Sequence, residues 1–124
     1  MTFLGIDYGR SKLGLAIAYG SLAEPLVVLK SEELEKIKEI VKKEKVEKII
    51  VGVSDGEMGK ESRDFGLKLS QELGLPVDFQ DENLSSIDAQ RFAIEAGIKR
   101  SKRKALEDSY AAAVMLQNYL DNHS

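Results

Sequence analysis

The most apolar stretch of the sequence carries a carboxylate. Asp7 lies within the run Phe3–Tyr8, with a glycine two residues away on either side. An ionised carboxylate in a buried strand is costly unless it is paired or holds a metal ion, and the glycines would let another group approach the backbone closely. Neutralisation by Lys12 or Arg10 is the purely structural alternative, so the residues alone leave both interpretations open.

Two further acidic positions fall where an α/β fold would place a site. Asp81 and Glu82 directly follow the run Val77–Gln80, and α/β sheets place their sites at the carboxyl ends of parallel strands. Two acids there would also suit the N-terminus of a following helix. Asp108 stands before three alanines, which would give the last helix a small-residue face for close approach to the sheet. The alternative for Asp108 is a solvated acid in a first helical turn.

Three carboxylates on separate elements can bind divalent cations through oxygen ligands. Mg²⁺ prefers a few carboxylates and fills its other positions with water and phosphate oxygens. Two such ions roughly 3.5–4 Å apart can activate a water and stabilise the leaving oxygen of a phosphodiester. The sequence has no cysteine, and we expect its one histidine, His123, to lie in a frayed tail. Oxygen-ligated chemistry needs neither residue.

A run of basic residues precedes Asp108. Five of the six residues from Lys99 to Lys104 are positively charged, and such runs bind nucleic acids because phosphate neutralisation drives association. A solvated loop is the alternative, since the net charge of the chain is −3. Basic residues beside Asp7 favour nucleic-acid binding, because positive charge then flanks the acids twice. The expected phosphate-binding residues are Arg10, Lys12, Lys99, Arg100, Lys102, Arg103 and Lys104.

The length and composition limit the classes of protein to which the chain can belong. The chain has 124 residues, 43% of them apolar and 31% charged, which predicts one globular domain over residues 1–124 with its own core. The lack of cysteine excludes disulfide scaffolds, thiolate zinc sites and thiol catalysis. No apolar run approaches the roughly 20 residues that cross a bilayer, and no targeting segment is evident. We therefore expect a soluble, cytoplasmic protein with no membrane partner.

The hydrophobic pattern predicts elements in the order βββαβαβαα. The tight basic loop between the first two strands predicts an antiparallel hairpin, and helices between the later strands predict parallel pairing. The result is an α/β fold with a mixed five-stranded sheet, antiparallel at strand 2 and flanked by helices. Ser31 is expected to cap the first helix and Gly74 to end the second. The expected strands are 3–8, 13–19, 26–29, 48–53 and 77–80, with a loop over 54–60 and the last two helices over 85–97 and 105–120.

Four segments together resemble the motifs of the YqgF/RuvX family. They occur in the family's order and extend over essentially the whole chain. Any one of them is a weak signal, but four in register are fairly specific. The segments are Gly5–Gly9 followed by Lys12, Gly14 and Ala16, then Ile49–Val53, Asp81–Ser86, and Lys104–Ala112.

The resemblance implies a fold, an activity and a set of site residues. The fold would be RNase H-like, of the Holliday-junction-resolvase type. Asp7, Glu82 and Asp108 would be the catalytic, metal-binding carboxylates, with Asp81 as a possible substitute for Glu82, and the cofactor would be Mg²⁺ or Mn²⁺. The activity would be that of an endo- or exonuclease which trims the 5′ end of pre-16S rRNA during ribosome biogenesis.

Two alternative functions stay open at this point. One is a Holliday junction resolvase that acts on branched DNA, for which a homodimer rather than a monomer would suit the substrate. The other is a ribosome-maturation factor that binds RNA without cutting it. The second alternative is motivated by Asn83, which stands where the family has an arginine, because loss of a guanidinium removes a bidentate phosphate donor.

Overall fold

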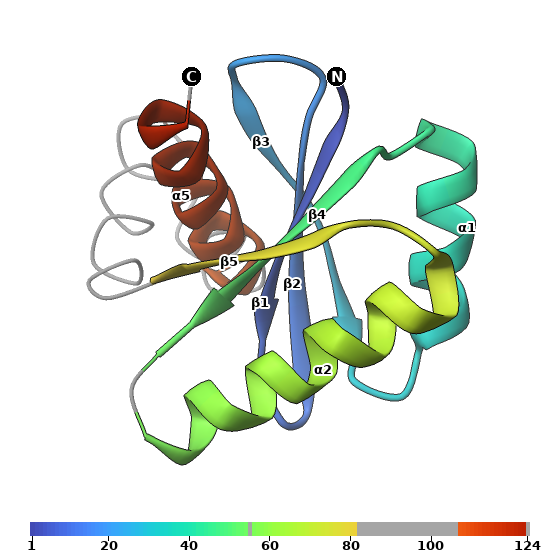
Figure 1. Ribbon diagram of the computed structural model, residues 1–124, viewed down its shortest axis with the longest axis vertical. Helices are drawn as coiled ribbons and strands as arrows, with labels where there is room; N and C mark the ends of the chain where they lie inside the picture. The colour runs from blue at the N-terminus through green and yellow to red at the C-terminus, as the bar shows by residue number, and fades with distance from the viewer. Residues whose placement is uncertain (55, 82–106, 124) are drawn as a thin grey trace.

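The computed structural model describes residues 1–54, 56–81 and 107–123, and in this part of the chain it shows five strands and three helices (Figure 1). The sheet has the order β3-β2-β1-β4-β5. The strands are β1 (Phe3–Tyr8), β2 (Lys12–Ala18), β3 (Ala23–Lys30), β4 (Lys48–Val53) and β5 (Val77–Asp81), and the helices are α1 (Leu34–Glu44), α2 (Glu57–Leu73) and α5 (Glu107–Asn122).

The strand pairing confirms the predicted mixed sheet. β2 runs antiparallel to both of its neighbours, β1 and β3, because the loops that join these strands are too short for a crossover. β1 pairs in parallel with β4, and β4 with β5, because α1 and α2 carry the chain back between them. The carboxyl ends of β1, β4 and β5 therefore lie side by side at one end of the sheet.

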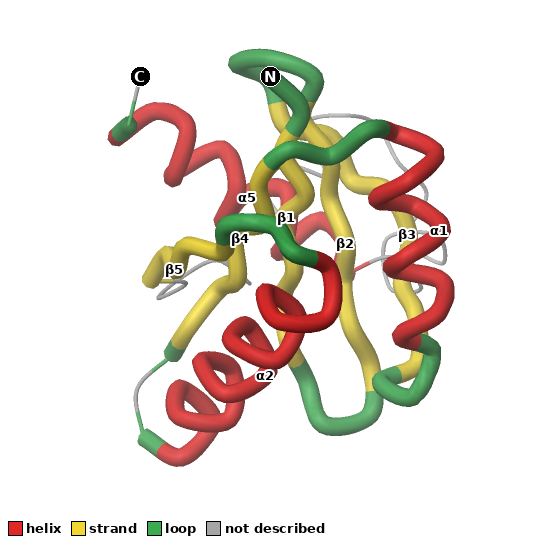
Figure 2. Tube along the Cα trace, turned by 45° about the vertical axis from the view of Figure 1, so that its right-hand side comes forward, coloured by secondary structure: helices red, strands yellow, loops and turns green. Residues whose placement is uncertain are grey.

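Each face of the sheet is covered by helices. α1 and α2 lie on one face and α5 on the other, as Figures 1 and 2 show. Alternate residues along each strand point to opposite faces, so the core is divided into two apolar clusters. The α1/α2 side includes Ile6, Leu15, Ile49, Ile37 and Leu69, and the α5 side includes Ala16, Ala18, Ile50, Ala112 and Leu116.

α5 approaches the sheet closely through small residues. Ala111, Ala112 and Ala113 are all buried, as the small-residue face in the sequence predicts. On the sheet side, a Cβ at Gly5 would lie 2.9 Å from the Cβ of Leu116, which is closer than side chains normally pack. The short distance between helix and sheet positions the first turn of α5 over β1 and β2.

The predicted cap of α1 is wrong. The helix begins at Leu34, and the residue before it, Glu33, makes no side-chain capping bond. The Ser31 hydroxyl instead donates to the carbonyl of Arg10 at 2.7 Å, and the Glu33 carboxylate accepts the N–H of Lys30 at 2.9 Å. The Ser31 bond joins the end of β3 to the first hairpin loop, and the Glu33 bond is local to the turn after β3, so neither side chain caps the helix.

The loop predicted over 54–60 is also wrong in its second half, because α2 already begins at Glu57. Gly59 gives the physical reason: a Cβ there would lie 1.9 Å from the carbonyl oxygen of Ser54, so glycine lets the first turn fold back on the preceding segment. The predicted end of α2 is confirmed, since Gly74 has φ 67° and its N–H donates to the carbonyl of Ser70. No described helix combines the length and apolarity that a bilayer span requires.

β3 is longer than the predicted 26–29, and its start includes Pro25 beside a register shift at Leu15/Ala16. Proline is tolerated there because β3 is an edge strand. The helix predicted over 85–97 lies outside the described residues.

Candidate functional site

Asp7 has a glycine as its partner on each neighbouring strand. It pairs with Gly14 of β2 on one side and with Gly52 of β4 on the other. Alternation along β1 places Asp7 on the same face as Gly5, which is the face that α5 covers. Its side chain is half-buried. Asp7 is therefore flanked by a glycine on each neighbouring strand near the end of β1.

The start of α5 brings Asp108 to the same place. A Cβ at Gly14 would lie 2.0 Å from the carbonyl oxygen of Asp108 and 2.9 Å from its Cβ. Asp108 therefore sits directly over Gly14, the residue that pairs with Asp7 across β1 and β2. Two of the three predicted acidic residues, from the two ends of the sequence, thus lie at neighbouring positions on one face of the sheet.

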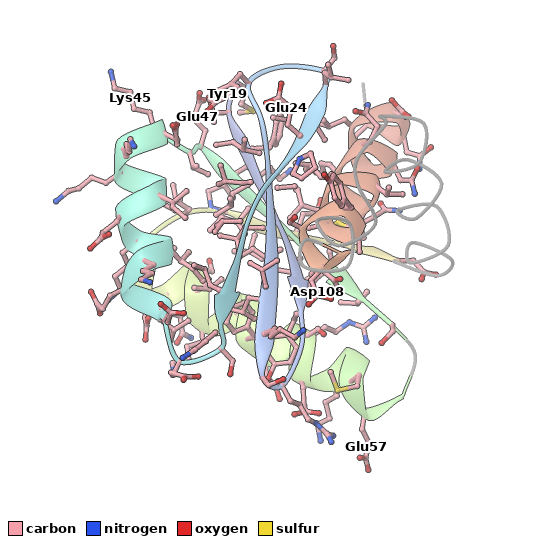
Figure 3. All side chains as sticks on the ribbon, turned by 180° about the vertical axis from the view of Figure 1, so that it is seen from behind. Tyr19, Glu24, Lys45, Glu47, Glu57 and Asp108 are labelled. Atoms are coloured by element: carbon pink, nitrogen blue, oxygen red, sulfur yellow. The ribbon has the colours of Figure 1, made fainter. Side chains whose placement is uncertain are left out.

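Lys12 forms an ion pair with Asp108. Its Nζ lies 3.7 Å from Oδ2 of Asp108, and the side chains are 66% and 40% exposed. Figure 3 shows Asp108 well apart from Tyr19, Glu24 and Glu47, which lie at the far end of the sheet. The sequence predicts Lys12 as a phosphate-binding residue, and the structure adds that its ammonium group pairs with Asp108.

Arg10 pairs with a partner that sequence reasoning missed. Its Nη2 and Nε donate to Oε2 of Glu61 at 2.8 and 3.1 Å. The hydrogen bonds and the charge of Glu61 raise the pKa of the Arg10 guanidinium. Glu61 belongs to α2, and no sequence spacing links it to the hairpin loop of Arg10. The guanidinium keeps further donors that face solvent.

Asp81 lies on the other face of the sheet. It pairs with Val53 in the register of β4 and β5, and it alternates with Phe79, whose ring contacts Gly66 of α2. Gln80 is the β5 residue that shares the row of Asp7, since it pairs with Gly52. Sequence reasoning missed Gln80, because only the strand register reveals its neighbours.

The remaining predicted site residues lie outside the described part of the chain. They are Glu82, Lys99, Arg100, Lys102, Arg103 and Lys104. Within residues 1–54, 56–81 and 107–123, no group of three or more acidic or histidine side chains is arranged to hold a metal ion. Of the three predicted carboxylates, the structure describes Asp7 and Asp108, and Glu82 lies outside the described residues.

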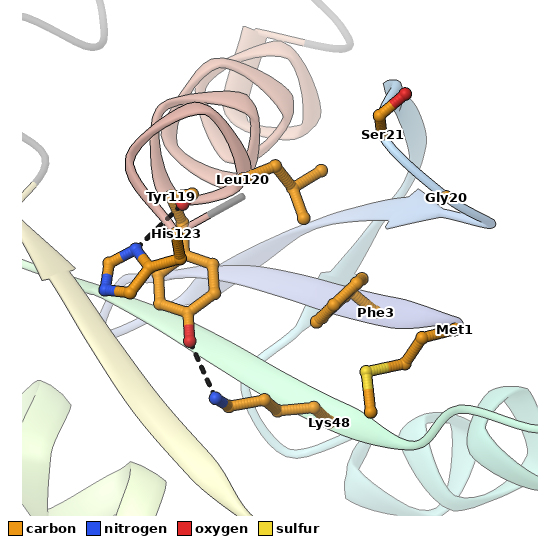
Figure 4. Close-up of a pocket in the computed structure, with 8 residues that line it drawn as sticks. All are labelled: Met1, Phe3, Gly20, Ser21, Lys48, Tyr119, Leu120 and His123. Carbon is orange, nitrogen blue, oxygen red and sulfur yellow. Dashed lines mark hydrogen bonds between the residues drawn. The ribbon is translucent and has the colours of Figure 1, made fainter.

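A second polar cluster lies at the opposite end of the sheet, beside a cavity of about 530 Å³ (Figure 4). Lys48 Nζ donates to the Tyr119 hydroxyl at 2.7 Å, and that hydroxyl donates to Oδ2 of Asp78 at 2.8 Å. The hydrogen bond to Tyr119 raises the pKa of Lys48. The backbone N–H of Phe79, and then Tyr119, lower the pKa of Asp78.

His123, which the sequence predicts to lie in a frayed tail, is exposed and follows the last residue of α5, and it contacts the same cluster. Its ring stacks on Tyr119 with centroids 4.0 Å apart, and its Nδ1 lies 2.9 Å from the Tyr119 carbonyl oxygen. The charged groups of this cluster are satisfied by each other, and the cavity beside them has mainly apolar walls, including Met1, Phe3 and Leu120. The cluster ties the end of α5 to β4 and β5.

Known proteins resemble the chain in sequence. The family model described as "RuvX: Holliday junction resolvase" matches residues 1–122. A protein of Lactococcus lactis, named "Putative pre-16S rRNA nuclease", is 34% identical over 98% of this chain and 94% of its own length. A protein of the same name from Streptococcus sanguinis is 37% identical over 99% of both chains.

Solved structures resemble the chain in fold. RuvC of Thermus thermophilus, in complex with a Holliday junction substrate, superposes with a TM-score of 0.65 at 20% identity over 100% of this chain and 97% of that one. The fowlpox virus Holliday junction resolvase superposes with a TM-score of 0.62 at 14% identity over all of both chains. These matches confirm the RNase H-like fold. With the sequence matches, they show that the chain belongs to the RuvX family.

Proposed function

We propose that this protein is a divalent-metal-dependent nuclease that hydrolyses phosphodiester bonds during 5′-end processing of pre-16S rRNA. The observation that carries the proposal is the approach of Asp108 to Gly14, the strand partner of Asp7. That approach gives the face two carboxylates from separate elements. The names of the relatives from Lactococcus and Streptococcus support the RNA substrate, and such a substrate would place the protein in the cytoplasm.

The donor set suits a hard cation. The candidate ligands are the oxygens of Asp7, Asp108 and Glu82, and Mg²⁺ and Mn²⁺ prefer oxygen donors of this kind. Gly14, which pairs with Asp7, lacks a Cβ, and this lets the start of α5 bring Asp108 next to the position of Asp7. When bound, the metal would supply a water activated for attack and would neutralise charge on the leaving oxygen. In this proposal Glu82 rather than Asp81 is the third ligand, because Asp81 lies on the opposite face of β5.

The basic residues would hold the substrate. Arg10 and Lys12 lie on the hairpin next to Asp7 and Asp108, and each is well exposed. Their charges would neutralise phosphates of a structured RNA, together with the run Lys99–Lys104. Phosphate contacts of this kind fix the position of a nucleic acid without reading its sequence.

The test is cleavage of a model RNA that carries the 5′ extension of pre-16S rRNA, in the presence of Mn²⁺. Asp7→Asn and Asp108→Asn should each slow cleavage by about a hundredfold or more, because loss of an outer partner of a metal site already costs 10–100-fold. Asp64→Asn is a matched control, since Asp64 is exposed on α2. Equal rates for the wild type and Asp7→Asn would exclude the assigned mechanism.

Branched DNA is the second candidate substrate. The description of the family model and the fold shared with two Holliday junction resolvases favour it. A four-way junction should therefore be offered in the same assay. Faster cleavage of the junction than of the RNA would reassign the substrate. Binding of the RNA in EDTA without cleavage in Mn²⁺ would favour a non-cleaving maturation factor.

A further inference from the structure

Lys12 is placed where a bound cation would compete with it. Its Nζ lies 3.7 Å from Oδ2 of Asp108, one of the carboxylates that the proposed function assigns to the metal. Alternation along β2 puts Lys12 on the same face as Gly14, beneath Asp108. The carboxylate of Asp108 therefore already has a positive partner from within the chain.

A residue of β3 also favours the position of Lys12 beside Asp108. Lys12 pairs directly with Lys30 of β3, and like charges directly opposite each other on antiparallel strands repel. The tight hairpin also fixes the backbone, since a Cβ at Gly9 would lie 2.7 Å from the carbonyl oxygen of Lys12. Repulsion from Lys30 and attraction to Asp108 favour the same position of the Lys12 ammonium group.

We propose that Lys12 couples cation binding to nucleic-acid binding by exchanging Asp108 for a phosphate of the substrate. Without substrate, the ammonium group shares Asp108 with the cation and weakens cation binding by charge repulsion. When a nucleic acid is bound, a phosphate oxygen accepts a hydrogen bond from the Lys12 ammonium group, and the repulsion between Lys12 and the cation is relieved. The inference rests on the proposed function, because it takes Asp108 as a metal ligand.

The expected size of the effect follows from the exposure of the pair. Because the side chains of Lys12 and Asp108 are 66% and 40% exposed, the high-dielectric limit applies, and the cation affinity should change by about three- to tenfold. Coupling between two ligands is reciprocal. RNA should therefore tighten cation binding by the same factor by which the cation tightens RNA binding.

The experiment measures Mn²⁺ binding by calorimetry, with and without a phosphorothioate-modified model RNA that resists cleavage. In the wild type the RNA should tighten Mn²⁺ binding by about three- to tenfold. Lys12→Met should bind Mn²⁺ tighter than the wild type in the absence of RNA and should lose most of the coupling. Lys12→Arg should retain the coupling. Lys38→Met, on α1 across the sheet, makes the same change in net charge and should behave as the wild type.

The outcomes separate this inference from the proposed function. Unchanged or weaker Mn²⁺ binding by a folded Lys12→Met, or coupling that survives the substitution, would overturn the role of Lys12 while Asp7→Asn still abolishes cleavage. If Asp7→Asn and Asp108→Asn bind Mn²⁺ as the wild type does, the metal site itself is wrong and both proposals fail. Thermal unfolding of each variant establishes that it is folded.

Discussion

Gly14 and Asp108 are in such close contact that no side chain fits between them. A Cβ on Gly14 would lie 2.0 Å from the carbonyl oxygen of Asp108 and 2.3 Å from its carbonyl carbon. Both atoms belong to the backbone, so relief would require the first turn of α5 to move. Because Gly14 pairs with Asp7, this contact sets how closely the two acids approach.

Gly14→Ala should therefore displace the start of α5. Overpacking of this kind costs about 1–3 kcal/mol of unfolding free energy, or more where backbone must shift, and we expect activity to fall further than the loss of stability explains. Gly20→Ala is the control, because nothing lies within 4 Å of a Cβ at that position. Thermal unfolding and cleavage assays on both variants measure the two effects. A Gly14→Ala protein as stable and active as Gly20→Ala would contradict the role given to this contact.

Local patterns predicted the fold well where one residue type determines the structure. Gly74 ends α2, and the short basic loop forces the β1–β2 hairpin. Local patterns failed where a residue bonds to a partner that is distant in the sequence. Ser31 has the properties of a helix cap but donates to the carbonyl of Arg10. A nearer contact was also missed: Gly59 lies in the first turn of α2, where its lack of a Cβ lets the helix pack on Ser54.

The sequence predicted which residues belong to the candidate site better than it predicted which residues they contact. The apolar surroundings of Asp7 and the alanines after Asp108 marked both acids as unusual, and Asp108 lies over Gly14, the strand partner of Asp7. The Arg10–Glu61 pair and the alignment of Gln80 with Asp7 depend on helix position and strand register. Neither leaves a periodic signal in the sequence.

Glu61 should restrain the contribution of Arg10 to nucleic-acid binding, because it already neutralises the guanidinium. Glu61→Gln should tighten RNA binding, and Arg10→Gln should weaken it and reduce the slope of log K against log salt by about 1. Lys43→Gln, at an exposed position of α1, controls for net charge. Fluorescence anisotropy at several salt concentrations gives these values. A salt slope unchanged by Arg10→Gln would show that Arg10 contacts no phosphate.

Tyr119 should stabilise the fold in a pH-dependent way. Its hydroxyl is buried between Lys48 and Asp78, and its loss in Tyr119→Phe should cost about 1 kcal/mol of unfolding free energy near neutral pH. The pKa of Asp78 is lowered on folding, so its contribution is complete above the ordinary value of 3.8 and is lost as pH falls through the lower folded value. The pKa of Lys48 is raised, so its contribution is present below the ordinary value of 10.5 and is lost as pH rises through the higher folded value.

The Tyr119→Phe variant should therefore differ most from the wild type between these two limits and least at the extremes of pH. Urea unfolding across the pH range measures the difference. Tyr19→Phe is the control, because Tyr19 is 57% exposed and its hydroxyl makes an exposed hydrogen bond to Glu44 rather than a buried one. A difference that is constant across the range would show that the hydroxyl stabilises the fold without coupling to the two charges.

The position of Asp81 predicts which of two adjacent acids the activity needs. Asp81 pairs with Val53 and alternates with Phe79, which contacts α2, so its side chain belongs to the face opposite Asp7. The proposed function therefore assigns the third ligand position to Glu82, the next residue in the sequence, rather than to Asp81. Glu82→Gln should then reduce Mn²⁺-dependent cleavage by about a hundredfold or more, whereas Asp81→Asn should retain most of the wild-type rate. Cleavage of the same RNA by both variants is the measurement. The reverse ranking would mean that Asp81 is the metal ligand and that its side chain lies on the face of Asp7.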